Sequence, residues 1–239
     1  MLIGHYAVAL AAKRTEPRAS LGLLFLAVQF ADLLFFPLVV IGVESAQIVP
    51  NLTEASHFEL ESAPFTHGLL GSALTALAIY VGFRLLARRS GVETRIPLVM
   101  AVAVMSHWAL DVIVHTPDMA IVTGGDPVVG FGLWDSAIGT YLLEAVLILG
   151  GLWLYLQATA GTSRTARYGM VGFVAFMLLF NVLNLFQPAP DADASVSALA
   201  IPAVAGYLAF AGVALWLDRA RQPLSTRDEV FNARVEVAL

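Results

Sequence analysis

The chain has 239 residues, of which 59% are hydrophobic and only 13% are charged, and its mean hydropathy is +0.79. This charged share is about half that of an ordinary soluble domain, so the composition argues against a soluble globular protein. The chain has no cysteine, which excludes a disulfide framework and a thiolate metal site.

The apolar stretches predict an all-α, polytopic membrane helix bundle. Residues 1–12 are apolar but too short to cross a bilayer, and we expect them to form a half-helix that enters the membrane and packs against the other helices. Because about 20 residues span the ~30 Å hydrocarbon layer, six further stretches predict six transmembrane helices: 19–42, 66–87, 96–115, 133–157, 168–186 and 197–217. Pro37 lies inside the first span and is expected to kink it.

The charges alternate between the connecting segments. All 13 Lys and Arg residues fall in the basic turn after residue 12 or in segments 84–95, 158–168 and 218–239. The intervening segments 43–65, 116–132 and 187–196 carry acidic residues and no Lys or Arg. Basic residues concentrate on the cytoplasmic side of membrane proteins. The pattern therefore predicts a multi-pass membrane protein with its N- and C-terminal basic segments in the cytoplasm.

We expect three parts along the chain. The N-terminal helix and the first four spans (1–157) carry the candidate site, two further spans (158–217) support it, and residues 218–239 form a cytoplasmic tail.

Ionisable side chains within these membrane segments mark the candidate site. Each costs about 2.5–3.5 kcal/mol at the centre of a membrane helix, and such groups usually face the interior of a bundle. The predicted membrane segments contain or adjoin His5, Asp32, His67, His107, Asp111, His115 and Glu144.

The spacing of these side chains predicts that they meet. His107, Asp111 and His115 are separated by four residues each, which places them on one face of a helix. At about 1.5 Å per residue from the basic edges, Asp32 lies at the depth of His107, roughly 18–20 Å into the membrane. His67 and Asp111 come out at roughly 25 Å, whereas His5 lies lower, at roughly 12 Å.

A divalent cation explains the set better than separate structural roles do. Taken singly, His5 could be a packing residue, His67 could sit at a helix start, and His107 with Asp111 could be a hydrogen-bonded pair. Together, however, three buried carboxylates would cost on the order of 9 kcal/mol without a cation. Nitrogen and oxygen donors without sulfur predict zinc first, with manganese or iron as alternatives. Five candidate ligands exceed a tetrahedral set, so either two ions bind or some groups support the ligands from outside.

Several motifs resemble a family of bacterial inner-membrane metal-dependent hydrolases. The matching segments are GHYAVALAAKR at 4–14, QFADLLF at 29–35, GVE at 42–44, PFTHGLL at 64–70, SHWALDVIVHTPD at 106–118 and GLWDS at 132–136. The resemblance covers roughly the first 145 residues. It implies a metal site formed by His5, Asp32, His67, His107 and Asp111. It also implies a supporting or catalytic role for Glu44, His115, Asp118 and Glu144. The family usually has Ser where this chain has Gly68, so one hydroxyl group is missing here.

The first functional hypothesis is a metal-dependent hydrolase that acts on a lipid-like or amphiphilic substrate through a metal-activated water. Its candidate catalytic residues are Glu144, His115 and Asp118, with Glu144 or Asp111 as general base and His115 as proton carrier. The outer segment 43–65 would be a lid over the site, and membrane lipids are the expected partners.

Two other functions remain open. The same His and Asp residues could relay ions or protons in a transporter or channel, although the sequence has no inverted repeat and no pair of broken helices. The residues could also serve only to specify helix packing. No basic tail or aromatic platform indicates nucleic-acid binding, and the sequence does not determine the oligomeric state.

Overall fold

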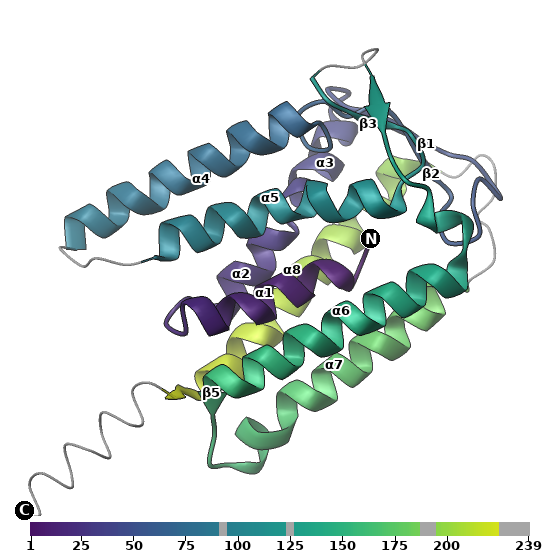
Figure 1. Cartoon of the computed structure of the whole chain (residues 1–239). Coiled ribbons are helices and arrows are strands. Elements are labelled where there is room, and N and C mark those ends of the chain that lie inside the picture. Colours follow the sequence, from purple (N-terminus) through teal and green to yellow (C-terminus); the bar gives the residue numbers. More distant parts are fainter. Residues whose placement is uncertain (91–94, 123–126, 187–194, 225–239) are drawn as a thin grey trace, which may run out of the picture.

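The computed structural model describes residues 1–90, 95–122, 127–186 and 195–224, and these form a bundle of eight α-helices (Figure 1). This confirms the predicted all-α class. The helices are α1 (Gly4–Thr15), α2 (Leu21–Val28), α3 (Phe30–Val40), α4 (Leu69–Ser90), α5 (Ile96–Val114), α6 (Ala137–Ala158), α7 (Arg164–Leu185) and α8 (Val196–Arg219).

The helices of this bundle are long and apolar enough for a multi-pass membrane protein. Five of them, α4 to α8, could each cross a bilayer, and α2 with α3 makes a sixth span if the bent pair is counted as one. The two helices of this pair meet at an angle of 51°. The break falls at Gln29, whereas Pro37, where the sequence predicts a kink, lies inside α3.

Helix α1 lies at the centre of the bundle, between α5 and α6 in the view of Figure 1. Its residues Tyr6, Ala9 and Leu10 have no exposed surface. Helix α6 approaches it closely, because a Cβ atom on Gly151 would lie only 2.5 Å from the carbonyl oxygen of Ala7. Small residues allow such close backbone contact between membrane helices. The predicted N-terminal half-helix is therefore a buried element of the core.

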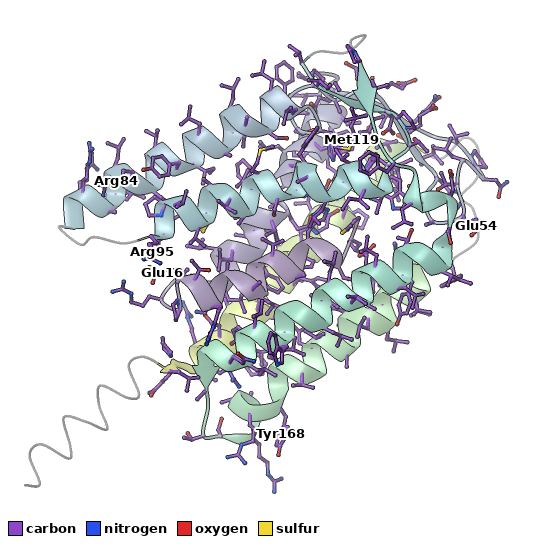
Figure 2. The ribbon with its side chains drawn as sticks, in the orientation of Figure 1. Glu16, Glu54, Arg84, Arg95, Met119 and Tyr168 are labelled. Carbon is purple, nitrogen blue, oxygen red and sulfur yellow. The ribbon has the colours of Figure 1, made fainter. Side chains whose placement is uncertain are left out.

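The outer surface of the bundle is apolar, and its charges lie toward the ends. On α4, Leu74 and Leu77 are more than half exposed, as expected of a helix that faces lipid. Arg84 and Arg95 lie at one end of the bundle, and Glu54 lies at the opposite end (Figure 2). The two ends thus differ in charge as the sequence pattern requires.

Short antiparallel strand pairs lie at the two ends. β1 (Ser45–Ile48) pairs with β2 (Phe58–Ser62), β3 (Met119–Ala120) with β4 (Val128–Val129), and β5 (Thr159–Ala160) with β6 (Gln222–Pro223). The β1–β2 hairpin lies within the segment predicted as a lid, and the amide of Leu60 donates a hydrogen bond to Asp118 Oδ2. The hairpin is thereby docked onto the loop that follows α5. Residues 225–239, most of the predicted tail, lie outside the described residues.

Candidate metal centre

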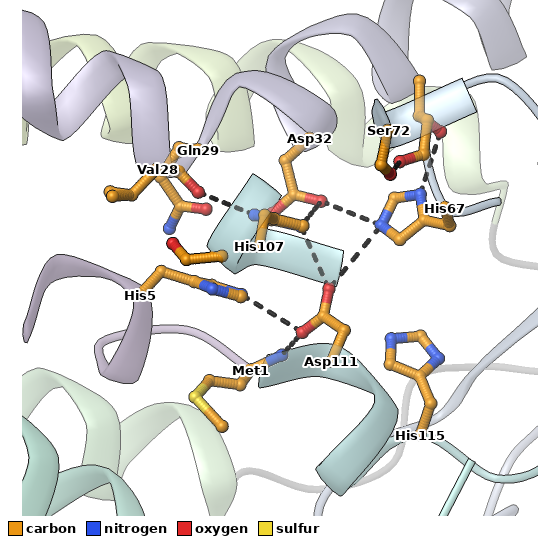
Figure 3. A network of polar contacts seen from close by, with 12 residues as sticks. Met1, His5, Val28, Gln29, Asp32, His67, Ser72, His107, Asp111 and His115 are labelled. Carbon is orange, nitrogen blue, oxygen red and sulfur yellow. Dashed lines mark hydrogen bonds and ion pairs between the residues drawn. The ribbon is translucent and has the colours of Figure 1, made fainter. Parts of the chain in front are cut away.

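Four of the predicted ligands converge inside the bundle, and we call them the His/Asp quartet: Asp32, His67, His107 and Asp111 (Figure 3). Asp32 lies in the first turn of α3, His67 lies just before α4, and the other two lie one turn apart on α5. Three of the four are almost completely buried, and the side chain of Asp32 is 17% exposed.

The polar atoms of the quartet alternate between imidazole nitrogen and carboxylate oxygen. Asp32 Oδ1 lies 3.4 Å from Nε2 of His67 and 3.6 Å from Nε2 of His107. Asp111 Oδ2 lies 3.9 Å and 3.0 Å from the same two nitrogens. Tetrahedral zinc with bonds of about 2.0–2.1 Å places its ligand atoms about 3.3–3.4 Å apart. The four measured distances lie on both sides of this value, so small shifts would bring the atoms around one ion.

A hydrogen bond to the broken helix fixes the orientation of His107. Its Nδ1 lies 2.7 Å from the carbonyl oxygen of Val28, and a carbonyl can only accept, so Nδ1 carries the proton. In an unbroken helix this carbonyl would bond the amide of Asp32, four residues on. The break at Gln29 therefore makes the carbonyl available, and it leaves Nε2 of His107 as the ring nitrogen that faces the centre of the quartet.

Thr66 and Glu44 orient His67 in the same way. The hydroxyl of Thr66 donates to Glu44 Oε2 at 2.6 Å and lies 2.9 Å from Nδ1 of His67. Because the single hydroxyl proton is used on Glu44, the oxygen of Thr66 accepts the Nδ1 proton of His67. Nε2 of His67 is then the ring nitrogen that faces the quartet.

The two carboxylates are held by their other oxygen atoms. Asp32 Oδ2 accepts a hydrogen bond of 2.8 Å from the hydroxyl of Tyr207 on α8. Asp111 Oδ1 lies 2.6 Å from the amine of Met1 and 3.1 Å from Nε2 of His5. Each of the four side chains thus presents one atom to the centre while a neighbour holds the other.

This arrangement suits a divalent cation. Two imidazole nitrogens and two carboxylate oxygens face each other in a buried space, where the carboxylates require positive charge from protonated rings or from a metal ion. Nε2 of His107 is buried, and no described residue gives it a hydrogen bond. Two overlapping sets of side chains, His5–His107–Asp111 and Asp32–His67–His107, have ligand atoms close enough to hold an ion.

His5 lies at the side of the quartet. Its imidazole stacks on that of His107, with ring centroids 3.9 Å apart and planes within 7° of parallel. Neither of its buried ring nitrogens has a hydrogen-bond partner within the described part of the chain.

His115 and Asp118 form a separate pair next to the quartet. Nδ1 of His115 lies 3.0 Å from Asp118 Oδ1, and its ring contacts those of Trp134 and His67, with centroids 4.1 Å and 6.0 Å away. Burial lowers the pKa of His115 below its ordinary value of 6.5, although its hydrogen bond to Asp118 acts in the opposite direction. His115 is therefore neutral at pH 7 and able to accept a proton.

Glu144 lies outside the quartet and binds the start of α1. Its Oε2 accepts hydrogen bonds from the amides of Leu2 at 3.1 Å and Gly4 at 2.9 Å. A carboxylate in this position satisfies free amides and opposes the positive end of the helix dipole. These contacts give Glu144 a structural role, and its proposed role as general base stays a prediction.

The packing at position 68 explains the missing hydroxyl. A Cβ atom on Gly68 would lie 2.4 Å from the carbonyl oxygen of Pro64, so this backbone has no room for a serine there. Two other hydroxyl groups contact the quartet, those of Thr66 and Tyr207.

Comparisons of the chain with protein-family models, with curated proteins and with solved structures found no match. The chemistry of the quartet therefore has to be deduced from its own residues and their distances.

Proposed function

We propose that this protein is a membrane-embedded, metal-dependent hydrolase that acts on a lipid-like or amphiphilic substrate. The observation that carries the proposal is the orientation of the quartet, in which outer hydrogen bonds at Nδ1 direct both Nε2 atoms toward two carboxylates. The proposal agrees with the resemblance to the bacterial inner-membrane hydrolase family. Zinc is the metal that this donor set favours, with manganese or iron as alternatives.

The metal and His115 would divide the chemistry between them. A divalent ion supplies a water of pKa near 7 and polarises a phosphoryl or carbonyl oxygen of the substrate. His115, neutral and held by Asp118 beside His67, would take the proton of the attacking water and return it to the oxygen of the broken ester bond. We assign this transfer to His115 because the carboxylate of Glu144 already accepts amides of α1.

A crevice on the lipid-facing side supports a lipid-like substrate. Its lining includes Ala31 and Thr66, which adjoin Asp32 and His67 in the chain. Phe65, which is 58% exposed, also lines it. A lipid-like substrate would reach the quartet from this side only after the crevice widens, because its free volume is about 10 Å³.

The membrane orientation is part of this proposal. Basic residues lie on the cytoplasmic side of multi-pass proteins, so we assign the end with Arg84 and Arg95 to the cytoplasm of a bacterial cell. The β1–β2 hairpin and the His115–Asp118 pair would then lie toward the opposite face of the inner membrane.

The bent α2–α3 pair favours a second candidate function, ion- or proton-coupled transport. Transporters often bind ions where a membrane helix is interrupted, and this break supplies a contact to His107. Only one such pair occurs among the described helices. Flux into proteoliposomes that disappears in both Asp32→Asn and Asp111→Asn would favour transport over hydrolysis.

Metal analysis tests the hydrolase directly. Purified wild-type protein should retain at least one divalent ion per chain and hydrolyse a phospholipid or carboxylic ester. His107→Ala should lose both properties. The control is Trp108→Phe, whose neighbouring indole nitrogen has no described hydrogen-bond partner; it should keep both. A folded wild type that binds no divalent ion after dialysis against zinc would contradict the proposal.

A further inference from the structure

The crevice on the lipid-facing side leads from the surface of the bundle toward the quartet. Leu34 on α3 and Phe65 just before α4 are 37% and 58% exposed and lie at its mouth, whereas Val104 on α5 is buried and lines it from within. Three lining residues adjoin members of the quartet in the chain: Ala31 next to Asp32, Thr66 next to His67, and Val104 one turn from His107.

The crevice runs in the same direction as a lipid chain. The hairpin end of the bundle contains the start of α4 at Leu69 and the end of α5 at Val114. At 1.5 Å per residue, His107 lies about 10 Å from that end of α5 and Val104 about 15 Å. The crevice therefore leads from the level of the quartet toward the middle of the bilayer. In a phospholipid of the same leaflet, the ester bonds lie near the edge of the hydrocarbon layer and the acyl chains run toward its middle.

The walls of the crevice suit an apolar chain. Ala31, Leu34 and Val104 present only hydrocarbon, and burial of apolar surface against them is favourable. The hydroxyl of Ser72, which also lines the crevice and lies near His67 in Figure 3, donates a hydrogen bond of 3.1 Å to the carbonyl oxygen of Thr66. This hydroxyl is thus satisfied by the protein and requires no polar group from a ligand.

The backbone at the mouth is fixed, but the side chain of Phe65 is not. Glu44 Oε1 accepts hydrogen bonds from the amides of Phe65 and Thr66 at 2.9 Å and 3.0 Å. The first turn of α4 also packs closely on this segment, because a Cβ atom on Gly71 would overlap the carbonyl oxygen of Phe65. The ring of Phe65 is more than half exposed, and exposed side chains change rotamer rapidly. Rotation of this ring is therefore the motion that opens the mouth most easily.

We propose that the crevice between α3 and α4 admits one acyl chain of a glycerophospholipid from the bilayer, and that the ring of Phe65 is its gate. The free volume of about 10 Å³ holds no more than about one water molecule, so the chain enters only when the ring turns away. This inference rests on the proposed function, because a chain in the crevice brings its ester bond to the level of the quartet. Phe65 then determines which chains reach the site.

Photocrosslinking detects the acyl chain without any hydrolysis. Full-length protein is reconstituted into phosphatidylcholine vesicles that contain a phosphatidylcholine with a diazirine in one acyl chain, and after illumination the adducts are assigned to single residues by mass spectrometry. Wild type should form an adduct at the buried Val104. Phe65→Ala should increase this adduct several-fold, and Phe65→Trp should decrease it. Leu77→Ala is the matched control, because Leu77 is 56% exposed on α4 and does not line the crevice; it should leave the adduct unchanged.

The possible outcomes separate the gate from the proposed function. No adduct at Val104 in either wild type or Phe65→Ala would mean that something other than a lipid chain covers this face, and it would overturn the inference. Equal labelling of Val104 in Phe65→Ala, Phe65→Trp and Leu77→Ala would show that the ring is not a gate. Labelling that depends on Phe65 in a protein that binds no zinc and hydrolyses no ester would support the gate and contradict the proposed function.

Discussion

At the scale of single residues, the candidate site depends on atoms that never face its centre. His67 and His107 differ in their partners, one held by a hydroxyl and the other by a backbone carbonyl, yet both carry the proton on Nδ1. An imidazole without such a partner could turn or exchange its protonated nitrogen. Residues around the ligands should therefore affect metal affinity almost as strongly as the ligands do.

Thr66 offers a specific test of this view. Thr66→Val keeps the shape of the side chain but removes the oxygen that accepts from His67 and donates to Glu44. We expect zinc affinity to fall about 10- to 100-fold, as for other outer partners of metal ligands, and Thr66→Ser to retain most of it. Competition with a chromophoric chelator measures the affinity.

Thr75→Val is the control for this experiment, because Thr75 lines the crevice and does not adjoin a ligand. The zinc affinity of Thr75→Val should equal that of wild type. If Thr66→Val also binds zinc as wild type does, the hydroxyl has no part in orienting His67.

The side chains of the quartet could be predicted from the sequence, but their supporting contacts could not. Asp32, His107 and Asp111 are costly in a membrane helix, so each one carries a signal. Tyr207 carries no such signal, because a tyrosine is unremarkable in an apolar span. Its contact with Asp32 depends on the packing of α8 against α3, which is visible only in the tertiary structure. The role of the Val28 carbonyl could not be predicted from the sequence for another reason. Every residue has a backbone carbonyl, and only the break in the helix leaves this one free to bind His107.

At the scale of elements, the first span shows where sequence patterns are weakest. Its hydropathy is continuous across Gln29, and its conspicuous helix breaker is Pro37, so the sequence predicts a kink at Pro37 and does not reveal the break at Gln29. The position of the break instead matches the tertiary contacts of the bundle. It directs Asp32 and the carbonyl of Val28 toward α5, and both reach His107.

The contact between α1 and α6 provides a test at this scale. Gly151→Ala would place its Cβ 2.5 Å from the carbonyl oxygen of Ala7 and 2.8 Å from its Cα. The helices would have to separate, so we expect a loss of about 1–3 kcal/mol in the free energy of unfolding, typical of overpacking. Thermal unfolding in detergent, followed by circular dichroism, measures the change.

Gly150→Ala is a closely matched control, because the neighbouring position on α6 has nothing within 4 Å of an added Cβ. It should be neutral, or stabilising by up to about 1 kcal/mol through helix propensity. Equal destabilisation by both substitutions would mean that the close approach of α1 and α6 is not the cause. Separation of the helices should also displace His5, whose ring stacks on that of His107.

At the scale of the whole molecule, the helices could be predicted almost completely. Lipid requires each span to satisfy its own backbone hydrogen bonds, so length and hydropathy alone reveal α4 to α8. The central place of α1 is less visible, because its twelve residues are too few to span. Its apolar surface on all sides was the available signal, since a helix that is hydrophobic all round is normally buried.

The orientation in the membrane decides which compartment the site serves. The quartet and the His115–Asp118 pair lie toward the end of the bundle that carries the β1–β2 hairpin, away from the end that carries Arg84 and Arg95. If the basic end is cytoplasmic, the crevice receives substrate nearer the outer leaflet of the inner membrane. The absence of cysteine from the sequence makes this assignment testable with single introduced thiols.

Glu61→Cys and Thr162→Cys place such a thiol at exposed positions near the two opposite ends. In intact spheroplasts, a membrane-impermeant maleimide should label Glu61→Cys and should label Thr162→Cys only after the membrane is permeabilised, because basic residues such as those near Thr162 favour the cytoplasmic side, where we propose that this end lies. The cysteine-free parent is the blank. The reverse labelling pattern would mean that the protein has the opposite orientation in the membrane. The substrate would then reach the quartet from the cytoplasmic leaflet.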